Sequence, residues 1–160
     1  MKTALVVIDV QNYFVNEKTK ELPAKIATYI RNNKFDFVLF TQFINRKGSN
    51  FFKLLNWRKS TSSPEIDIHS TLVPFVTKNN LFKKYTYSIF KSKDFTEFLN
   101  KNRISKVYLC GIDSDSCVLA SAFDAFDLDY EVKVLTDLSM SHSGDHSAAL
   151  RIINRNIQKI

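Results

Sequence analysis

Two hydrophobic patterns alternate along the chain and predict its secondary structure. Short, continuous apolar runs rich in β-branched residues are typical of strands buried on both faces, and they occupy residues 4–9, 35–41, 107–111 and 132–136. Apolar residues at helical spacing predict helices at residues 22–33, 94–102, 117–129 and 146–157. This alternation predicts an α/β fold of three layers (αβα), in which helices cover both faces of a Rossmann-like, mostly parallel sheet.

The pattern breaks down between residues 45 and 80, where polar and aromatic residues surround Pro64 and Pro74. Long irregular segments in compact domains are often binding loops. The chain shows no repeat, low-complexity tract or linker, and its 160 residues fall within the usual range of one domain. We therefore expect a single domain over residues 1–160, with a candidate binding loop in this irregular stretch.

Composition narrows the class of protein. No apolar run approaches the roughly 20 residues that a membrane-spanning helix needs, and the first residues do not resemble a signal peptide. Cys110 and Cys117 are the only cysteines, too few for a disulfide scaffold or a cysteine-based zinc site. These features predict a cytoplasmic protein with free thiols and no membrane contact.

The formal net charge of +7 does not by itself indicate a nucleic-acid-binding protein. The lysines and arginines are scattered, and no motif of a nucleic-acid-binding fold accompanies them. We expect a solvated basic surface and a small-molecule partner. A positive field that attracts anionic small molecules stays open as an alternative.

Three reactive side chains follow strands or short apolar steps. Asp9 ends the first strand, Lys84 follows the apolar pair at 81–82, and Cys117 begins the helix after the third predicted strand. Ligands of open parallel sheets bind beyond the carboxyl ends of the strands, so joint placement there predicts a reactive site. Taken singly, each residue has an ordinary explanation as a loop cap, a solvated lysine or a small buried hydrophobe.

Cys117 is the strongest candidate nucleophile. Ser114, Asp115 and Ser116 precede it as candidate helix caps, and amides at a helix start favour the thiolate, which predicts a lowered thiol pKa. Cys110 lies inside a predicted strand, so we expect it to be inert.

Motifs in five places carry a resemblance to a known family. Residues 6–14 (VVIDVQNYF) fit a strand that ends in D-x-Q-x-x-F, and residues 84–90 (KYTYSIF) fit K-x-x-Y-S-x-F. Residues 110–118 (CGIDSDSCV) resemble G-x-x-T-D-x-C-V with Ser114 in place of threonine, residues 124–125 fit a D-A pair, and Asp137 and His146 begin two closing motifs. In this order they resemble the isochorismatase-like cysteine hydrolase superfamily, which includes nicotinamidases and carbamoylsarcosine amidases.

The resemblance implies a mechanism. Asp9 would accept the proton of Cys117, the thiolate would attack a carbonyl carbon, and Lys84 would orient the carboxylate and add positive charge. Backbone amides of Asp113 and Cys117 would form the oxyanion hole. The peptide that joins Ile112 to Asp113 would be cis.

A metal site is not expected, and neither is any other cofactor. Nicotinamidases carry a D-x-H motif after the second strand, where this chain has Phe43 and Asn45, which suit a metal poorly. His69 stands alone in that half of the chain, and His142 and His146 lie near its end.

Aromatic residues are candidates for the wall of a substrate pocket. Small-molecule sites are largely apolar, although core packing is the alternative for any one of these side chains. The expected lining residues are Gln11, Phe14, Phe43, Trp57 and Tyr87.

The sequence thus favours a metal-independent hydrolase that cleaves a C–N bond, of the amide or ureido/carbamoyl type, in a small molecule. Isochorismatase-type and nicotinamidase activities are the enzymatic alternatives, and Cys117 argues against the first. A catalytically silent binding or scaffold protein is the non-enzymatic one. The resemblance also implies a homo-oligomer, either a dimer or a tetramer.

Overall fold

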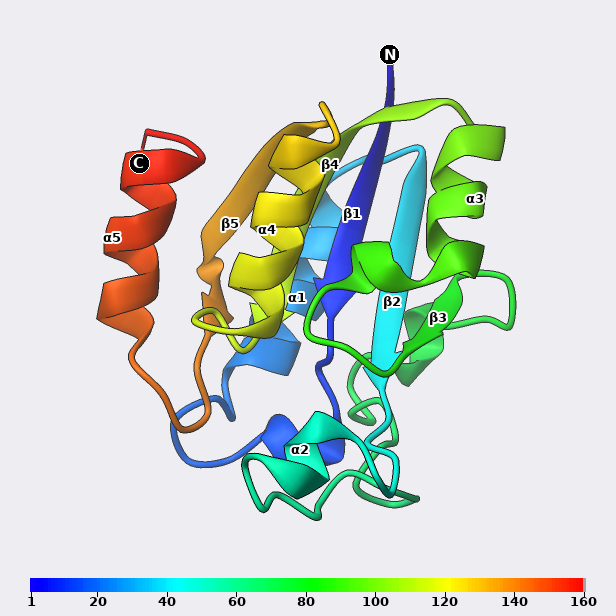
Figure 1. Cartoon of the computed structure of the whole chain (residues 1–160). Helices are drawn as coiled ribbons and strands as arrows, with labels where there is room; N and C mark the ends of the chain where they lie inside the picture. The colour runs from blue at the N-terminus through cyan, green and yellow to red at the C-terminus, as the bar shows by residue number, and fades with distance from the viewer. Residues whose placement is uncertain (160) are drawn as a thin grey trace.

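A five-stranded parallel sheet forms the centre of the protein, and the computed structural model describes residues 1–159 (Figure 1). The strand order is β3-β2-β1-β4-β5. The strands are β1 (Lys2–Ile8), β2 (Phe37–Phe43), β3 (Leu81–Lys84), β4 (Ile104–Ile112) and β5 (Glu131–Met140). The main helices are α1 (Leu22–Asn32), α2 (Asn50–Lys53), α3 (Lys93–Lys101), α4 (Cys117–Asp127) and α5 (His146–Asn156).

The continuous apolar run of β1 places this strand at the centre of the sheet. It pairs in parallel with β2 on one side and with β4 on the other. Because both of its faces are covered, residues 4–8 are at most 1% exposed. The buried-strand pattern in the sequence is thereby confirmed.

Helices cover both faces of the sheet. In Figure 1, α3 and α4 lie in front of it, α1 lies behind it, and α5 runs along the β5 edge. Ile26 of α1 packs in one hydrophobic cluster, while Leu99 of α3, Val118 of α4 and Ile153 of α5 pack in the other. The predicted three-layer αβα architecture is confirmed.

The strand order places a switch point between β1 and β4. The chain runs from β1 outward to β2 and β3, then returns across the sheet to β4 on the opposite side of β1. At such a point the loops after the two strands diverge and leave a crevice at the carboxyl ends. The loops after β1 and β4 carry Asp9 and the turn before Cys117.

Several elements differ from the sequence prediction. The apolar pair at 81–82 belongs to an edge strand of four residues, β3, which is too short to give a clear pattern in the sequence. β5 is longer than predicted because it continues through polar residues after a register irregularity in its pairing with β4. The irregular stretch 45–80 contains the short helix α2 and a 3₁₀ turn at Val73–Phe75.

No helix within residues 1–159 has the length and apolar character needed to span a membrane.

Candidate active site

Asp9 lies at the carboxyl end of β1 in the left-handed region of backbone space, with φ of 50°. Its side chain is fully buried. The Thr41 hydroxyl, from the neighbouring strand β2, donates to Asp9 Oδ1 at 2.5 Å and also accepts from the Asp9 amide at 3.1 Å. Thr41 therefore fixes one oxygen of the carboxylate and leaves Oδ2 for other partners. The sequence analysis did not identify this role of Thr41.

Lys84, the last residue of β3, points its ammonium group toward Asp9. Nζ lies 2.7 Å from Asp9 Oδ2, and it donates to the carbonyl oxygens of Thr86 at 2.8 Å and Tyr87 at 2.9 Å. Burial works against the charged form of Lys84, but Asp9 and Cys117 outweigh it, so the pKa of the Lys84 ammonium is raised. The group is held as a cation.

Cys117 is the first residue of α4, and its thiol completes the cluster. Lys84 Nζ lies 3.4 Å from Cys117 Sγ, and the Asp9 carboxylate is close enough to the thiol to raise its pKa. The structure thus brings together the three residues that the sequence singled out, from three different segments. Cys110, by contrast, is fully buried inside β4.

The predicted low pKa of Cys117 is wrong for the resting protein. Burial raises the pKa of the Cys117 thiol to about 12, and the Asp9 carboxylate adds to this effect, while Lys84 opposes it. The thiol is therefore protonated at neutral pH. The neighbouring Asp9 carboxylate is the group that can accept this proton.

The turn from Asp113 to Ser116 orients the nucleophile. The peptide between Ile112 and Asp113 is cis, as predicted from the resemblance. Within residues 1–159, the backbone amides of Asp113, Asp115 and Cys117 donate no hydrogen bond, whereas those of Ser114 and Ser116 do. Two of these three free amides, those of Asp113 and Cys117, are the pair expected to form the oxyanion hole.

The predicted capping of α4 is wrong. The Ser116 side chain makes no capping hydrogen bond. The Ser114 hydroxyl instead pairs with the His146 ring at 2.9 Å, and Asp115 accepts from the Asp145 amide at 2.8 Å. These side chains tie the nucleophile turn to the loop after β5.

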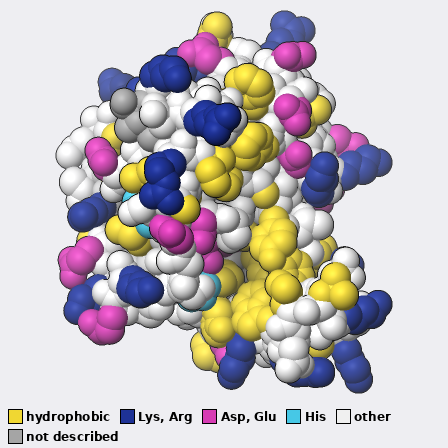
Figure 2. Space-filling view, turned by 60° about the vertical axis from the view of Figure 1, so that its left-hand side comes forward, with side chains coloured by type: hydrophobic (Ala, Val, Ile, Leu, Met, Phe, Trp, Pro, Cys, Tyr) yellow, Lys and Arg dark blue, Asp and Glu magenta, His cyan; other side chains and the backbone are white. Residues whose placement is uncertain are grey.

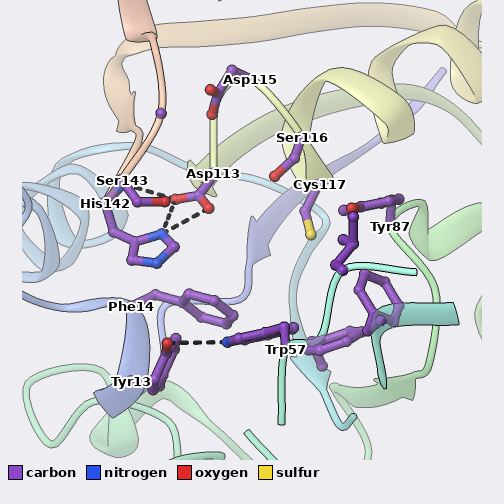
Figure 3. Close-up of a pocket in the computed structure, with 14 residues that line it drawn as sticks. Tyr13, Phe14, Trp57, Tyr87, Asp113, Asp115, Ser116, Cys117, His142 and Ser143 are labelled. Atoms are coloured by element: carbon purple, nitrogen blue, oxygen red, sulfur yellow. Dashed lines mark hydrogen bonds and ion pairs between the residues drawn. The ribbon is translucent and has the colours of Figure 1, made fainter. Parts of the chain in front are cut away.

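Cys117 points its sulfur into a cavity of about 390 Å³ (Figure 3). Its aromatic lining residues are Tyr13, Phe14, Phe43, Phe51, Trp57 and Tyr87. Its polar lining residues are Asp113, Asp115, Ser116, His142 and Ser143. The structure therefore places four of the five expected pocket residues on the wall, and it adds residues of the loop after β5, which the sequence analysis did not assign to the pocket.

Gln11 is the expected pocket residue that does not line the cavity. It is fully buried, and its amide donates to the carbonyl oxygens of Phe43 and Ile66 at 2.9 and 2.8 Å, while its Oε1 accepts from the Phe43 amide. These three hydrogen bonds join the β1 loop to the end of β2 and to the loop that carries Ile66. The prediction failed because a motif position does not show in which direction its side chain points.

The stretch after β2 does not fit a metal ion. Phe43 has no ligand atom, and its ring stacks on Trp57 at 5.7 Å between centroids. The Asn45 amide donates to the carbonyls of Trp57 and Lys59, and its oxygen accepts from Ser49. The His69 ring nitrogen Nδ1 accepts from the Thr71 amide. Within residues 1–159, no group of three or more histidine, cysteine, aspartate or glutamate side chains is arranged to hold a metal.

A parallel sheet with a buried Asp–Lys–Cys cluster under an aromatic pocket defines an α/β protein with the architecture of a small-molecule hydrolase. Residues 3–159 match the family described as the Isochorismatase domain. The chain belongs to the isochorismatase family of hydrolases, and the resemblance read from its motifs is confirmed.

Solved structures share the fold of this chain, and a curated relative is similar to it in sequence. A nicotinamidase from Bacillus subtilis superposes with a TM-score of 0.80 at 23% identity, covering 100% of this chain and 99% of that one. An N-carbamoylsarcosine amidase from Thermoplasma acidophilum gives 0.79 at 22% identity, covering 98% and 93%. A probable inactive nicotinamidase from Arabidopsis thaliana is 25% identical over 174 residues, covering 97% of this chain and 89% of the relative.

Proposed function

We propose that the protein is a cysteine-dependent hydrolase that cleaves a C–N bond, of the amide or ureido/carbamoyl type, in a small molecule. The observation that supports this proposal most directly is the position of the buried Lys84 ammonium between the other two side chains. Lys84 Nζ lies 2.7 Å from Asp9 Oδ2 and 3.4 Å from Cys117 Sγ. A nucleophile, a base and a fixed cation within hydrogen-bond reach are what covalent acyl transfer requires.

The first half of the reaction forms a thioester. Asp9 takes the Sγ proton of Cys117 as the sulfur attacks the substrate carbonyl carbon. The Lys84 ammonium stabilises the negative charge that develops on the sulfur during this step. The amides of Asp113 and Cys117 receive the developing oxyanion. When the tetrahedral intermediate collapses, the C–N bond breaks and the proton held by Asp9 passes to the leaving nitrogen.

The second half releases the acid. Asp9, once more a carboxylate, takes a proton from water as the water oxygen attacks the thioester carbonyl. The C–S bond breaks, and the proton returns to sulfur. Thr41 and Lys84 hold opposite oxygens of Asp9 throughout, so the carboxylate keeps its direction as its charge changes.

Ammonia release tests the proposal. We expect the wild-type protein to release ammonia from at least one member of a panel of small amides, ureides and carbamoyl compounds. Replacing the nucleophile, Cys117→Ala, should lower the rate at least about a thousandfold. Cys110→Ala, a matched cysteine replacement away from the pocket, should not. Equal activity of wild type and Cys117→Ala would refute the cysteine mechanism.

We further propose that the reaction is metal-independent and that nicotinamide is a poor substrate. The proposal rests on the chemistry of Phe43 and of Asn45, whose amide is committed to loop carbonyls. Activity should survive chelator treatment. Activity lost on chelation and restored by zinc, manganese or iron would bring nicotinamidase back as the leading assignment.

Two rival functions make different predictions. An isochorismatase-type enzyme would cleave a vinyl ether without using Cys117, so Cys117→Ala would remain active on that substrate. A silent binding protein, the possibility raised by the inactive Arabidopsis relative, would bind amides but release no ammonia. The intact cluster of Asp9, Lys84 and Cys117 favours cysteine-dependent hydrolysis over both. A homo-oligomer of two or four chains acting in the cytoplasm remains our prediction, and light scattering would test its size.

A further inference from the structure

Two side chains on the pocket wall, those of Asp113 and His142, have no part in the mechanism above, which uses only the backbone amide of Asp113. Both Asp113 oxygens lie 2.8 Å from Nδ1 of the His142 ring, and Oδ1 also accepts from the His142 backbone amide at 2.8 Å. The two side chains are 12% and 18% exposed, and both line the cavity. The carboxylate thus contacts both the ring and the backbone of His142, and the ring contact turns the Nδ1 edge of the imidazole toward Asp113.

The contact between Asp113 and His142 determines which nitrogen of the imidazole ring is free to bind a ligand. An ionised carboxylate only accepts hydrogen bonds, so Nδ1 carries a proton and donates it to Asp113. Nε2 has no hydrogen-bond partner within residues 1–159, and Figure 3 shows the Nε2 edge of the ring turned away from Asp113, on the side of Phe14. The Phe14 and Tyr13 rings contact the imidazole edge to face, at 5.1 and 5.8 Å between centroids. In the neutral ring, Nε2 is a fixed hydrogen-bond acceptor.

The charge of the cavity wall is opposite to that of the whole chain. The chain has a net charge of +7, yet the charged residues that line the cavity are Asp113 and Asp115, with no lysine or arginine among its lining residues. Figure 2 shows acidic and histidine side chains along one side of the hollow and hydrophobic ones along the other. An anionic substituent would meet repulsion here, while a hydrogen-bond donor or a cation would find acceptors and aromatic faces.

We propose that His142, held by Asp113, is a specificity-determining residue that selects amides bearing an N–H donor, such as an amine, at the end opposite the scissile carbonyl. This inference rests on the proposed function, because it takes the carbonyl to be bound at Cys117. The substrate would lie across the aromatic wall between the nucleophile and Nε2 of His142. The idea that the basic surface selects anionic substrates does not extend to this pocket.

Binding to the Cys117→Ala variant tests the inference without any chemistry. The probes are benzamide, 3-(aminomethyl)benzamide and 3-carbamoylbenzoate, which share a ring and a carboxamide and differ in the charge of the distal group. Calorimetry should show the amine probe binding at least about tenfold tighter than the carboxylate probe, with benzamide between them, as expected for one charge-assisted hydrogen bond. Equal affinities, tightest binding of the carboxylate, or no binding of any probe would overturn it.

A second substitution, His142→Phe, keeps a ring and removes the acceptor. It should abolish the preference for the amine probe and change benzamide affinity less than about threefold, whereas His69→Phe, outside the pocket, should retain the preference. A preference that survives in a folded His142→Phe variant would overturn the inference.

Should that variant fail to fold, imidazole ¹⁵N spectra of the Cys117→Ala protein give the same answer. The Nε2 signal of His142 should shift when the amine probe is added, and those of His69 and His146 should not; an unmoved His142 signal would overturn the inference. If the amine preference appears but the wild type releases no ammonia from any amide, the proposed function fails and the subsite stands.

Discussion

At the scale of single residues, the resting state of the nucleophile follows from a balance of burial and charge. Cys117 sits at a helix start beside a lysine, and both features favour a thiolate. Burial nevertheless dominates and keeps the proton on sulfur, with Asp9 as a neighbouring acceptor. The cluster is an Asp⁻–Lys⁺ pair with a neutral thiol, which becomes nucleophilic only as Asp9 takes its proton.

Alkylation should report this protonation state. Because the pKa of the Cys117 thiol is raised to about 12, its thiolate fraction rises with pH throughout the neutral and mildly alkaline range. We expect iodoacetamide to label Cys117 about tenfold faster for each pH unit between pH 7 and 9. Cys110 should stay unlabelled in the folded protein and react once the protein is denatured. Mass spectrometry would measure both, and a labelling rate that levels off near neutral pH would show that the thiol is already ionised.

Thr41 gives a second prediction at this scale. Its hydroxyl bonds both the carboxylate and the amide of Asp9, so Thr41→Val keeps the shape of the side chain and frees the base to rotate. Loss of a hydrogen bond to a charged group, about 1.5–3 kcal/mol, should lower kcat roughly 10- to 100-fold with little change in KM. Thr96→Val, which removes a hydroxyl bonded only to helix carbonyls, is the control. An unchanged kcat would show that Asp9 is oriented by other contacts.

At the scale of elements, the site depends on how closely β1 and β4 approach each other. Gly111 has φ of 121°, and a Cβ atom placed on it would lie 2.1 Å from the backbone oxygen of Ile8. The residue before Asp9 and the end of the strand that leads to Cys117 are therefore in direct contact. Only glycine allows these two strand ends to bring base and nucleophile together.

Gly111→Ala should therefore be severely destabilising. Both the backbone conformation and the close contact oppose a side chain, so we expect a loss of at least about 4 kcal/mol in the free energy of unfolding, or no folded protein at all. Gly48→Ala is the matched control, since Gly48 also has a positive φ, of 84°, but faces open space. It should lose only about 1–2 kcal/mol. Urea denaturation compares the two, and similar losses would contradict the steric argument.

At the scale of the whole molecule, the stability of the fold depends on two buried thiols, one of which is the candidate nucleophile. Burial raises the pKa of Cys110 as well as that of Cys117, so the native state keeps both thiol protons to higher pH than the unfolded chain does. The stabilisation is fully present below the unfolded thiol pKa of about 8.5 and is lost as pH rises toward the native values.

The free energy of unfolding should consequently fall above about pH 8.5. Each buried thiol contributes a slope of up to about 1.4 kcal/mol per pH unit. Cys110→Ala leaves a small cavity and lowers stability at every pH. It should also make the pH slope of the unfolding free energy shallower by the contribution of one buried thiol. Urea titrations at a series of pH values would measure both slopes, and parallel curves for the variant and the wild type would show that Cys110 does not titrate in this range.

Sequence patterns predicted the parts of the fold in which one physical cause dominates. The apolar run of β1 could only be a strand buried on both faces, and the reactive residues followed strands, where parallel sheets place ligands. The edge strand β3 escaped detection because four residues with one exposed face carry little periodic signal.

The rest depended on three-dimensional contacts between distant segments. The side chain of Gln11 turned away from the pocket, and burial reversed the pKa expected from the helix start at Cys117. The pairing of Asp113 with His142, separated by 29 positions, has no local signature. This pairing requires the loops after β4 and β5 to lie side by side, which composition and periodicity do not encode.

The central position of β1 has a consequence for biosynthesis. This strand is translated before both of its neighbours, and its partner on one side, β4, is complete only at residue 112. A nascent chain therefore carries an apolar strand with one unpaired edge while roughly a hundred further residues are translated, and such edges attract other chains. Ribosome-associated chaperones that shield unpaired strand edges should therefore aid the folding of this domain, and slow elongation before residue 104 would prolong the time during which the edge of β1 is exposed.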